Sequence, residues 1–386
     1  MPIYLNNAAT TWPKPDVVAS AMYEFITNHG ANLSRGSASK RDIESLDSVF
    51  SCRSAVASFF GGYERRSAKY VTFTANVTES INVVVKGILK AGMRVVTSSM
   101  EHNAVMRPLR SMEALGVDLE IVRCNLRGYL DPHAFDLALE DGADLAIISH
   151  CSNVCGAVQD IGAIAGVCSR RGVPLVVDCA QTAGIIPIEA EALGLSALCF
   201  TGHKGLFGPQ GTGGIVWNPE FASRCLPLIE GGTGSFSHEE RQPSQLPDKF
   251  EAGTPNIPGI VGLLAALEWI NKTGMDGIRA KEEALGARLE AGLADVKGLK
   301  ILGPGKGDLR LPVFSVNVEG LDNAYLALGL SEKYGVETRP GLHCAPIAHR
   351  TLGSFPEGAL RLSPGYFNSE EEIDVTIEAL KELAKR

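Results

Sequence analysis

Hydrophobic and polar residues alternate in blocks along the chain, and short apolar runs dominate the region from residue 70 to 218. Several runs are unbroken stretches of Val, Ile and Leu, which is typical of strands covered on both faces. Helix-like segments such as 78–90 and 160–171 separate the earlier runs. This alternation predicts an α/β fold in which a mostly parallel sheet is flanked by helices. The predicted strands are 69–75, 93–99, 118–124, 144–150, 173–179, 197–202 and 213–218.

The hydrophobic pattern changes after residue 255. A long helical stretch covers 259–295 and is broken near Gly274, and two strand-like segments and two further helices follow it. This order predicts a smaller α+β domain in the C-terminal part. The expected domains are 15–255 for the large one, and 1–14 together with 256–386 for the small one.

The last two predicted strands of the large domain are joined by a glycine-rich loop instead of a helix. Parallel neighbours need a long crossover, so this short loop predicts an antiparallel strand at one edge of the sheet. The polar segment 233–249 contains Pro and Ser and predicts an exposed loop.

The composition is that of an ordinary globular protein and narrows the choice of partners. The chain has 386 residues, of which 45% are hydrophobic, and its net charge is −8. A negative net charge argues against nucleic acid or an anionic membrane as the main partner. The apolar runs are too short to cross a membrane, and no signal-like segment is expected. The nine cysteines lack CxxC spacing, so we expect reduced cysteines and a cytoplasmic protein.

Polar side chains follow the ends of several predicted strands. In open parallel sheets, ligands bind outside the carboxyl ends of the strands, so one crevice could receive all of these side chains. Taken alone, each has an ordinary explanation, such as a helix N-cap for Asp178 or a surface charge for Lys204. Their shared placement favours a binding site. They are Thr78, His102, Asn153, Asp178, Gln181, Thr201, His203 and Lys204.

Lys204 lies in the glycine-rich loop GHKGLFGPQG, directly after a predicted buried strand. The loop has neither the P-loop spacing nor the GxGxxG pattern, so a nucleotide site is not favoured. It is typical of a backbone that approaches a flat, anionic ligand, with a lysine in reach. A lysine for a carbonyl, an aspartate for a ring nitrogen and a helix N-terminus for a phosphate suit pyridoxal phosphate.

Segments spread over nearly the whole chain match one family of enzymes. They are LNNAATT, EHNAV, HCSNVCG, LVVDCAQ, GHKGLFGPQGTGG, FEAGTPN, RPGLHCAPIAH and LRLSPGYFNSEEEID. With these segments the chain resembles the class V aminotransferase family. It resembles most the SUF-type (group II) cysteine desulfurase branch, whose members supply sulfur for iron–sulfur cluster assembly. The resemblance implies fold type I, pyridoxal 5'-phosphate as cofactor, and a homodimer with shared active sites. It also implies conversion of L-cysteine to L-alanine, with the sulfur passed to an acceptor protein.

The resemblance assigns residues to the cofactor ring. Lys204 would bond to the aldehyde of the cofactor, and Asp178 would pair with the ring nitrogen and keep it protonated. Gln181 would contact the 3′-oxygen. His102 would stack on the ring, and either His102 or Lys204 would serve as the base.

The resemblance also assigns residues to the cofactor phosphate. Thr78 would bind it at a helix N-terminus, where an anion is favoured. Thr201 and His203 would complete the phosphate site. Thr254 would reach the phosphate bound by the neighbouring subunit.

Substrate-binding residues follow from the same resemblance. Arg361 would clamp the substrate carboxylate, because a planar guanidinium suits a carboxylate better than an ammonium does. Asn153 would assist it, and Arg35 and Arg339 are weaker candidates at the pocket rim. Cys344 would take the sulfur as a persulfide, since positive charge nearby favours a thiolate.

Two departures from the family pattern have expected consequences. Asn6 stands where the family often has aspartate, which predicts altered N-terminal hydrogen bonding and little catalytic cost. Cys151 and Cys155 lie near the proposed crevice, and we expect core packing rather than redox chemistry for them.

Other functions remain open at this point. Selenocysteine lyase and cysteine sulfinate desulfinase activities would use the same site. A true class V aminotransferase would leave Cys344 idle. A metal- or redox-binding protein would instead use His150, Cys151, Cys155, His343 and Cys344, although their spacing is poor for a zinc site.

Overall fold

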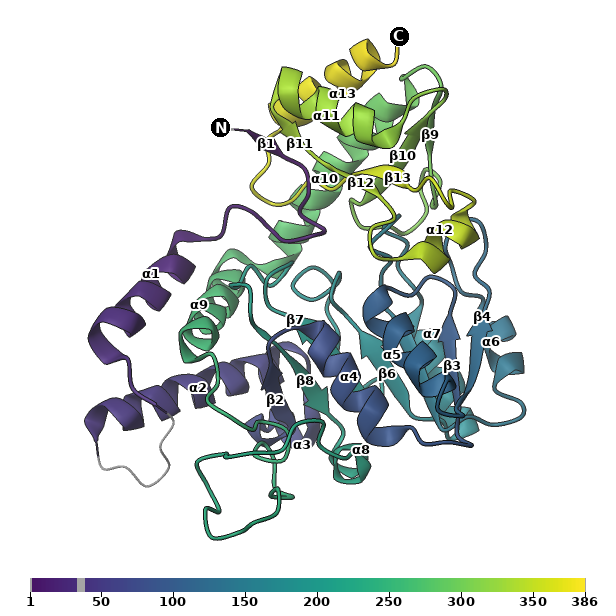
Figure 1. Cartoon of the computed structure of the whole chain (residues 1–386). Coiled ribbons are helices and arrows are strands. Elements are labelled where there is room, and N and C mark those ends of the chain that lie inside the picture. The colour runs from purple at the N-terminus through teal and green to yellow at the C-terminus, as the bar shows by residue number, and fades with distance from the viewer. Residues whose placement is uncertain (1, 33–38, 386) are drawn as a thin grey trace.

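The structure is a computed structural model that describes residues 2–32 and 39–385 (Figure 1). A seven-stranded sheet forms the centre of its larger part, in the order β2-β8-β7-β6-β5-β3-β4. Each predicted strand is confirmed. The strands are β2 (Val71–Thr74), β3 (Arg94–Ser98), β4 (Asp118–Val122), β5 (Leu145–Ser149), β6 (Leu175–Asp178), β7 (Ala197–Thr201) and β8 (Gly213–Trp217).

The antiparallel strand of this sheet is β8, and it lies inside the sheet rather than at its edge. It pairs antiparallel with both β7 and β2. The predicted edge position was wrong because β8 leaves its second side free for β2, the first strand of the sheet in the sequence. A side chain at Gly214 would collide with the backbone of Thr72 and the ring of Phe200, so glycine permits this close pairing.

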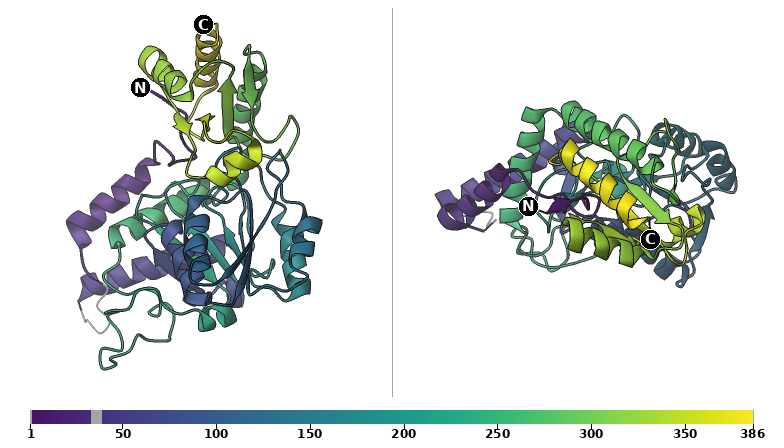
Figure 2. Two further views of the ribbon diagram at one scale, coloured as in Figure 1. Left: turned by 45° about the vertical axis from the view of Figure 1, so that its right-hand side comes forward. Right: turned by 90° about the horizontal axis from the view of Figure 1, so that it is seen from above.

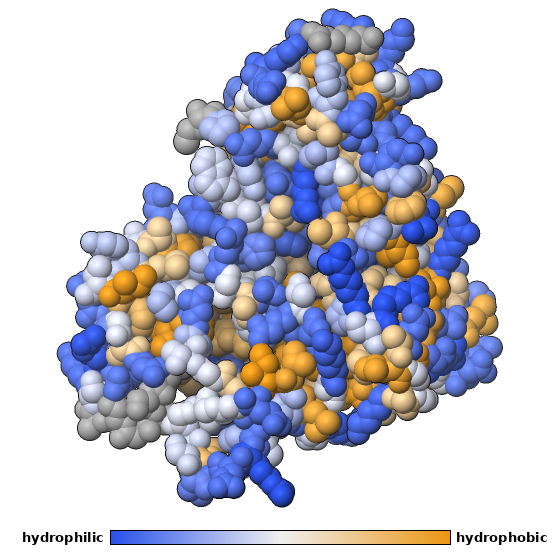
Figure 3. Space-filling model, in the orientation of Figure 1, coloured by the Kyte–Doolittle hydropathy of each residue, from blue (hydrophilic) through white to orange (hydrophobic). Residues whose placement is uncertain are grey.

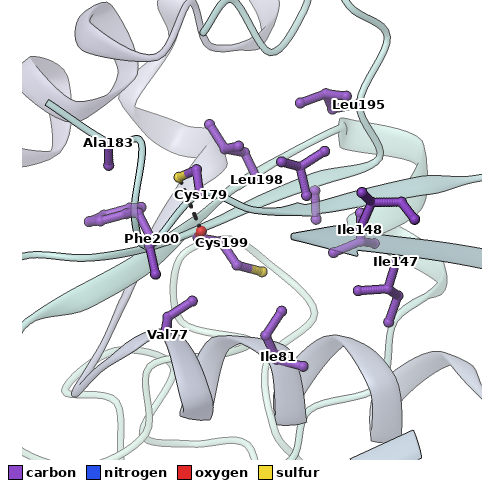
Figure 4. Close-up of a cluster of buried hydrophobic side chains, with 14 of the residues drawn as sticks. Val77, Ile81, Ile147, Ile148, Cys179, Ala183, Leu195, Leu198, Cys199 and Phe200 are labelled. Atoms are coloured by element: carbon purple, nitrogen blue, oxygen red, sulfur yellow. Dashed lines mark hydrogen bonds between the residues drawn. The ribbon is translucent and has the colours of Figure 1, made fainter. Parts of the chain in front are cut away.

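Helices cover the sheet on both sides (Figures 1 and 2). Val77 and Ile81 of α4 point towards the sheet, on the side where the Cys199 side chain of β7 lies (Figure 4). The helices of this part are α1 (Asp16–Glu24), α2 (Lys40–Phe59), α3 (Tyr63–Arg66), α4 (Val77–Ile88), α5 (Asn103–Glu113), α6 (Pro132–Ala138), α7 (Ile161–Arg171) and α8 (Pro219–Arg224).

The smaller part contains a second sheet and a second hydrophobic core. Its antiparallel sheet has the order β12-β13-β10-β9, and β1 pairs in parallel with β11. The strands are β1 (Ile3–Tyr4), β9 (Leu299–Ile301), β10 (Phe314–Val318), β11 (Val336–Glu337), β12 (Arg339–Gly341) and β13 (Ala359–Leu362). The helices are α10 (Met275–Ala294), α11 (Asn323–Tyr334), α12 (Pro346–Leu352) and α13 (Glu370–Leu383). Both chain ends lie in this part (Figure 1).

Helix α9 (Ile257–Thr273) precedes α10, and the predicted break at Gly274 between them is confirmed. The apolar side chains of α9 belong to the large core, because α9 packs against α1 and α2. Ile3 and Leu5, by contrast, belong to the small core. The domain division at residues 14 and 255 stays a prediction.

The surface of the described residues is mainly polar on the face shown in Figure 3, with small apolar patches between charged side chains. Within the described part of the chain, no helix has the length and apolar character needed to span a membrane.

Candidate active site

The carboxyl ends of β5, β6 and β7 lie at one edge of the large sheet. Ser149, Asp178 and Cys199 are paired across these strands, so the residues that follow them are neighbours. The small sheet contacts this edge, since Nη1 of Arg361 in β13 donates to the backbone oxygen of Asn153 at 3.0 Å. The candidate site therefore lies between the edge of the large sheet and the small sheet.

Lys204 follows β7 and is partly buried. Burial lowers the pKa of its amine to about 8; Arg361 and Arg339 act in the same direction, and Asp178 opposes them. Its Nζ has no hydrogen-bond or ion-pair partner among the described residues, and together with Gln181 it lines a cavity of about 40 Å³. Its amine is therefore available as a nucleophile near neutral pH.

The glycines around Lys204 allow close packing between loops of the chain itself. A side chain at Gly205 would approach the backbone oxygen of Ala183 to 2.5 Å, and one at Gly202 would collide with Thr212. We expected these glycines to let the backbone approach a ligand. The described contacts show that they hold the Lys204 loop against neighbouring loops, and the approach to a ligand stays a prediction.

Asp178 ends β6 and is 4% exposed. Its Oδ1 accepts a hydrogen bond from the N–H of Ala180 at 2.9 Å. Burial raises the pKa of this carboxyl, whereas the Ala180 N–H and the charge of Lys204 lower it. Gln181 donates through Nε2 to the backbone oxygen of Ala8 at 3.0 Å, so the N-terminal segment orients it.

His102 is the N-cap of α5, and its Nδ1 accepts a hydrogen bond from the N–H of Ala104 at 3.0 Å. Burial, together with the positive charges of Lys204, Arg339 and Arg361, lowers its pKa to about 3. The ring is therefore neutral at pH 7. Because Nδ1 is an acceptor, its single proton is on Nε2.

The residues predicted to bind the cofactor phosphate do not all lie together in the single chain. Thr78 is exposed in the first turn of α4. Thr201 is buried at the end of β7, and its hydroxyl donates to the Thr212 oxygen at 3.4 Å. Nδ1 of His203 is buried without a hydrogen-bond partner among the described residues. Thr254 is exposed and lines a separate cavity of about 850 Å³.

Arg361 is 1% exposed and forms no ion pair with any described residue. Its Nη1 contacts the Asn153 oxygen, its Nη2 donates to Oδ1 of Asn6 at 2.8 Å, and its Nε has no partner. Burial and the neighbouring Arg339 lower its pKa to about 9. A buried guanidinium held by neutral acceptors favours an anionic ligand.

Cys344 lies in the loop between β12 and α12, beside a guanidinium. All nine cysteines are described; eight are buried and Cys344 is exposed. Nη2 of Arg339 donates to its Sγ at 3.4 Å, and Arg339 is paired with Arg361 across the two strands. Asn153 donates through Nδ2 to the backbone oxygen of His343 at 2.7 Å, so the thiol loop and Arg361 share one support.

Some predicted residues do not join this arrangement. Arg35 lies outside the described residues. Cys151 and Cys155 are buried, and burial raises the pKa of both thiols. In residues 2–32 and 39–385, no group of three or more His, Cys, Asp or Glu side chains could hold a metal ion.

Sequence reasoning missed two residues that contact or line this site. Asn6 was noted only for its departure from aspartate, although it binds Arg361, which lies 355 positions away. Glu282 lines the Lys204 cavity, and burial raises its pKa to about 8. Its helical, charged sequence context is that of a surface glutamate, so no sequence signal marked it.

The residues present fit pyridoxal phosphate. The unpartnered amine of Lys204 suits the aldehyde, and the buried carboxyl of Asp178 suits a ring nitrogen. The neutral ring of His102 suits stacking, and the first turn of α4 suits a phosphate. The unpartnered Nδ1 of buried His203 is a further polar atom that lacks a partner within the chain.

The chain is similar to known proteins over almost its whole length. The family model described as Aminotransferase class-V matches residues 3–375. A probable cysteine desulfurase of Methanothermobacter thermautotrophicus is 31% identical, over 99% of this chain and 94% of its own length. A cysteine desulfurase of Enterobacter sp. is 31% identical, over 98% of this chain and 93% of its own. The apo structure of a cysteine desulfurase from Thermococcus onnurineus has a TM-score of 0.93 at 30% identity, covering 100% of this chain and 95% of that one.

Proposed function

The chain belongs to the class-V aminotransferase family, and from this premise we propose that it is a pyridoxal-phosphate-dependent cysteine desulfurase. It converts L-cysteine to L-alanine and keeps the sulfur on Cys344 as a persulfide. One observation carries the proposal beyond the family: the single exposed cysteine, Cys344, lies against Arg339, which is the cross-strand neighbour of Arg361.

Lys204, Asp178, Gln181 and His102 would hold the ring of the cofactor, and Thr78, Thr201 and His203 its phosphate. When bound, the cofactor supplies an electron sink that stabilises negative charge at the substrate α-carbon. Lys204 suits the role of the base because its pKa is lowered to about 8. His102 does not suit it, because its Nδ1 is occupied by the Ala104 N–H and its Nε2 already carries the proton.

Arg361 binds the substrate carboxylate and so orients the amino acid. Its two bonded nitrogens face the neutral oxygens of Asn153 and Asn6, which orient the guanidinium without neutralising it. Arg339 adds a second positive charge at the pocket rim.

Sulfur transfer takes place at Cys344. Its thiolate attacks the sulfur of the substrate, and an S–S bond forms as the carbon–sulfur bond breaks. The electron pair of the broken bond stays on the substrate carbon, which takes up a proton to give alanine. Nη2 of Arg339 lies against the Sγ that takes the sulfur, and exposure of Cys344 leaves the persulfide open to an acceptor.

We propose a homodimer with shared active sites. Thr254 is exposed and, within its own chain, is not among the residues that line the Lys204 cavity. It lines its cavity together with Phe50, an apolar side chain that is 63% exposed. Thr254 would reach the phosphate of the neighbouring subunit. Light scattering of the purified protein tests this, and a monomer would contradict it.

The persulfide passes to a sulfur-acceptor protein, and we propose iron–sulfur cluster assembly as its use. We place the protein in the cytoplasm, where an exposed thiol such as Cys344 stays reduced. Neither a nucleic acid nor a membrane is part of this proposal.

Alanine formation from L-cysteine by the cofactor-loaded protein tests the proposed function. Wild type is compared with Cys344→Ala and with Cys168→Ala, a control at a buried cysteine on α7. We expect alanine from wild type and from the control, and a loss of at least about a hundredfold in Cys344→Ala, because the nucleophile is gone.

Three other outcomes would redirect the proposal. Alanine formation that is unchanged in Cys344→Ala would remove Cys344 from the reaction. Activity only with selenocysteine or cysteine sulfinate would reassign the substrate. Production of a keto acid in place of alanine would indicate an aminotransferase.

A further inference from the structure

Three buried side chains form a continuous hydrogen-bonded chain beneath Cys344. Nε2 of His343 bonds to the backbone oxygen of Arg339 at 2.9 Å. Nδ1 of His343 lies 3.2 Å from Nε2 of His349, and Nδ1 of His349 lies 2.7 Å from the hydroxyl of Ser354. None of these three side chains has a role in the function proposed above.

The direction of each bond follows from the one oxygen that can only accept. The Arg339 carbonyl has no proton, so Nε2 of His343 must donate to it. Burial lowers the pKa of His343 to about 2 and that of His349 to about 4, so both rings are neutral. Nδ1 of His343 therefore accepts from His349, and Nδ1 of His349 accepts from Ser354. Every donor and acceptor of the chain is matched.

The hydrogen-bonded chain of His343, His349 and Ser354 supports a stretch of backbone whose conformation is unfavourable by itself. His343 and Cys344 both have left-handed backbones, with φ of 50° and 59°. Such conformations cost roughly 1–2 kcal/mol per non-glycine residue, so surrounding contacts must hold them. The backbone bond from the Asn103 N–H to the Cys344 oxygen, 2.8 Å, ties the same loop to the start of α5.

The chain also closes a ring of contacts around the thiol. His343 holds the backbone of Arg339, and the guanidinium of Arg339 donates to Sγ of Cys344. Moving the His343 ring would therefore move both the thiol and its cationic neighbour. Arg339 and Arg361, paired across β12 and β13, are the charged residues of these two strands.

We propose that His343, His349 and Ser354 are positioning residues that hold Cys344 against the guanidinium of Arg339. This inference rests on the proposed role of Cys344 as the sulfur acceptor. His349 and Ser354 act only through His343, and none of the three is assigned contact with the substrate.

The test measures the reactivity of Cys344 in the cofactor-loaded protein without substrate. The rate of alkylation by iodoacetamide is measured at pH 7.5 and at pH 10, which lies above the ordinary pKa of a free cysteine thiol. Subtracting the rate of Cys344→Ala removes the contribution of other cysteines. The ratio of the two rates then reports the charge contact and is corrected for access to the thiol.

Each variant removes or keeps particular hydrogen bonds of the hydrogen-bonded chain. His349→Leu removes both hydrogen bonds, whereas His349→Gln keeps an N–H group in place of Nε2–H. We expect the ratio to fall about three- to tenfold in His349→Leu and to stay near wild type in His349→Gln. Ser354→Ala should show a smaller fall, and the exposed control His133→Leu on α6 should show none. In turnover, kcat should fall in His349→Leu while KM for L-cysteine stays within about twofold.

An unchanged ratio in folded, cofactor-loaded His349→Leu would overturn the inference, and so would equal losses in His349→Leu and His349→Gln. If His349→Leu does not fold, an unchanged ratio in Ser354→Ala would overturn it. Failure of the proposed function is seen separately, as alanine formation that persists in Cys344→Ala. The alkylation ratio needs no turnover and still decides whether the chain holds the thiol.

Discussion

At the scale of single residues, neutral oxygens around a buried cation decide what the site can bind. Arg361 has no carboxylate partner among the described residues, and its pKa is lowered because it is buried and lies near Arg339. Asn6 accepts one of its hydrogen bonds without adding charge. The positive charge is thereby left for the carboxylate of a substrate.

Replacing Asn6 by aspartate should weaken substrate binding. In Asn6→Asp, a carboxylate beside Nη2 would compete with the substrate for the guanidinium, so we expect KM for L-cysteine to rise about five- to tenfold with little change in kcat. Asn6→Ala removes the acceptor without adding charge and should raise KM less. Steady-state alanine formation gives both constants, and an unchanged KM in Asn6→Asp would contradict the argument.

At the scale of elements, the strands and the loops that follow them position the residues of the candidate site. The strand pattern and the polar residues at the strand ends could be read from the sequence, because a periodicity of a few residues records local burial. The place of β8 inside the sheet could not, since it depends on pairing with β2, some 140 residues earlier. The loop that carries Lys204 is held in the same non-local way, against the segment around Gly184.

Gly184→Ala tests this support of the Lys204 loop. Gly184 has φ of 88°, and a side chain there would collide with the backbone of Gly205. We expect loss of bound cofactor and a lower melting temperature. Gly172→Ala is the matched control, because Gly172 has φ of 67° but open space around it, so it carries only the conformational cost of about 1–2 kcal/mol. Cofactor absorbance and thermal unfolding measure the effects, and equal effects of the two variants would refute the argument.

At the scale of the whole molecule, the N-terminal segment and α10 connect the large sheet to the small one. Asn6 and Ala8 contact Arg361 and Gln181, and Glu282 of α10 accepts the N–H of Tyr366 at 3.0 Å. Burial raises the pKa of Glu282 to about 8, far above the 4.5 usual for a glutamate. Between pH 4.5 and about 8, the folded protein therefore keeps a proton on Glu282 that the unfolded chain has lost.

Glu282 should make global stability depend on pH. Because its pKa is raised on folding, its stabilising contribution is complete below pH 4.5 and is lost as the pH rises to about 8. The loss amounts to about 1.4 kcal/mol per pH unit within that window. Glu282→Gln lacks this dependence. In urea unfolding, the free energy of unfolding of the variant relative to wild type should therefore rise by a few kcal/mol between pH 5 and pH 8.5. Glu283→Gln, at an exposed neighbour, should run parallel to wild type, and a Glu282→Gln curve that also does so would disprove the assignment.

The sequence by itself determined the seven strands of the large sheet, the break at Gly274, and the lysine, aspartate and histidine at the strand ends. These features depend on short-range periodicity and on motifs that are continuous in the chain. Only the tertiary structure decided the partner of Arg361, the hydrogen-bonded chain from Ser354 to Arg339, the burial of Glu282 and the place of β8. Each of these depends on which distant segments pack together, and the buried faces that bring them into contact leave no local pattern in the sequence.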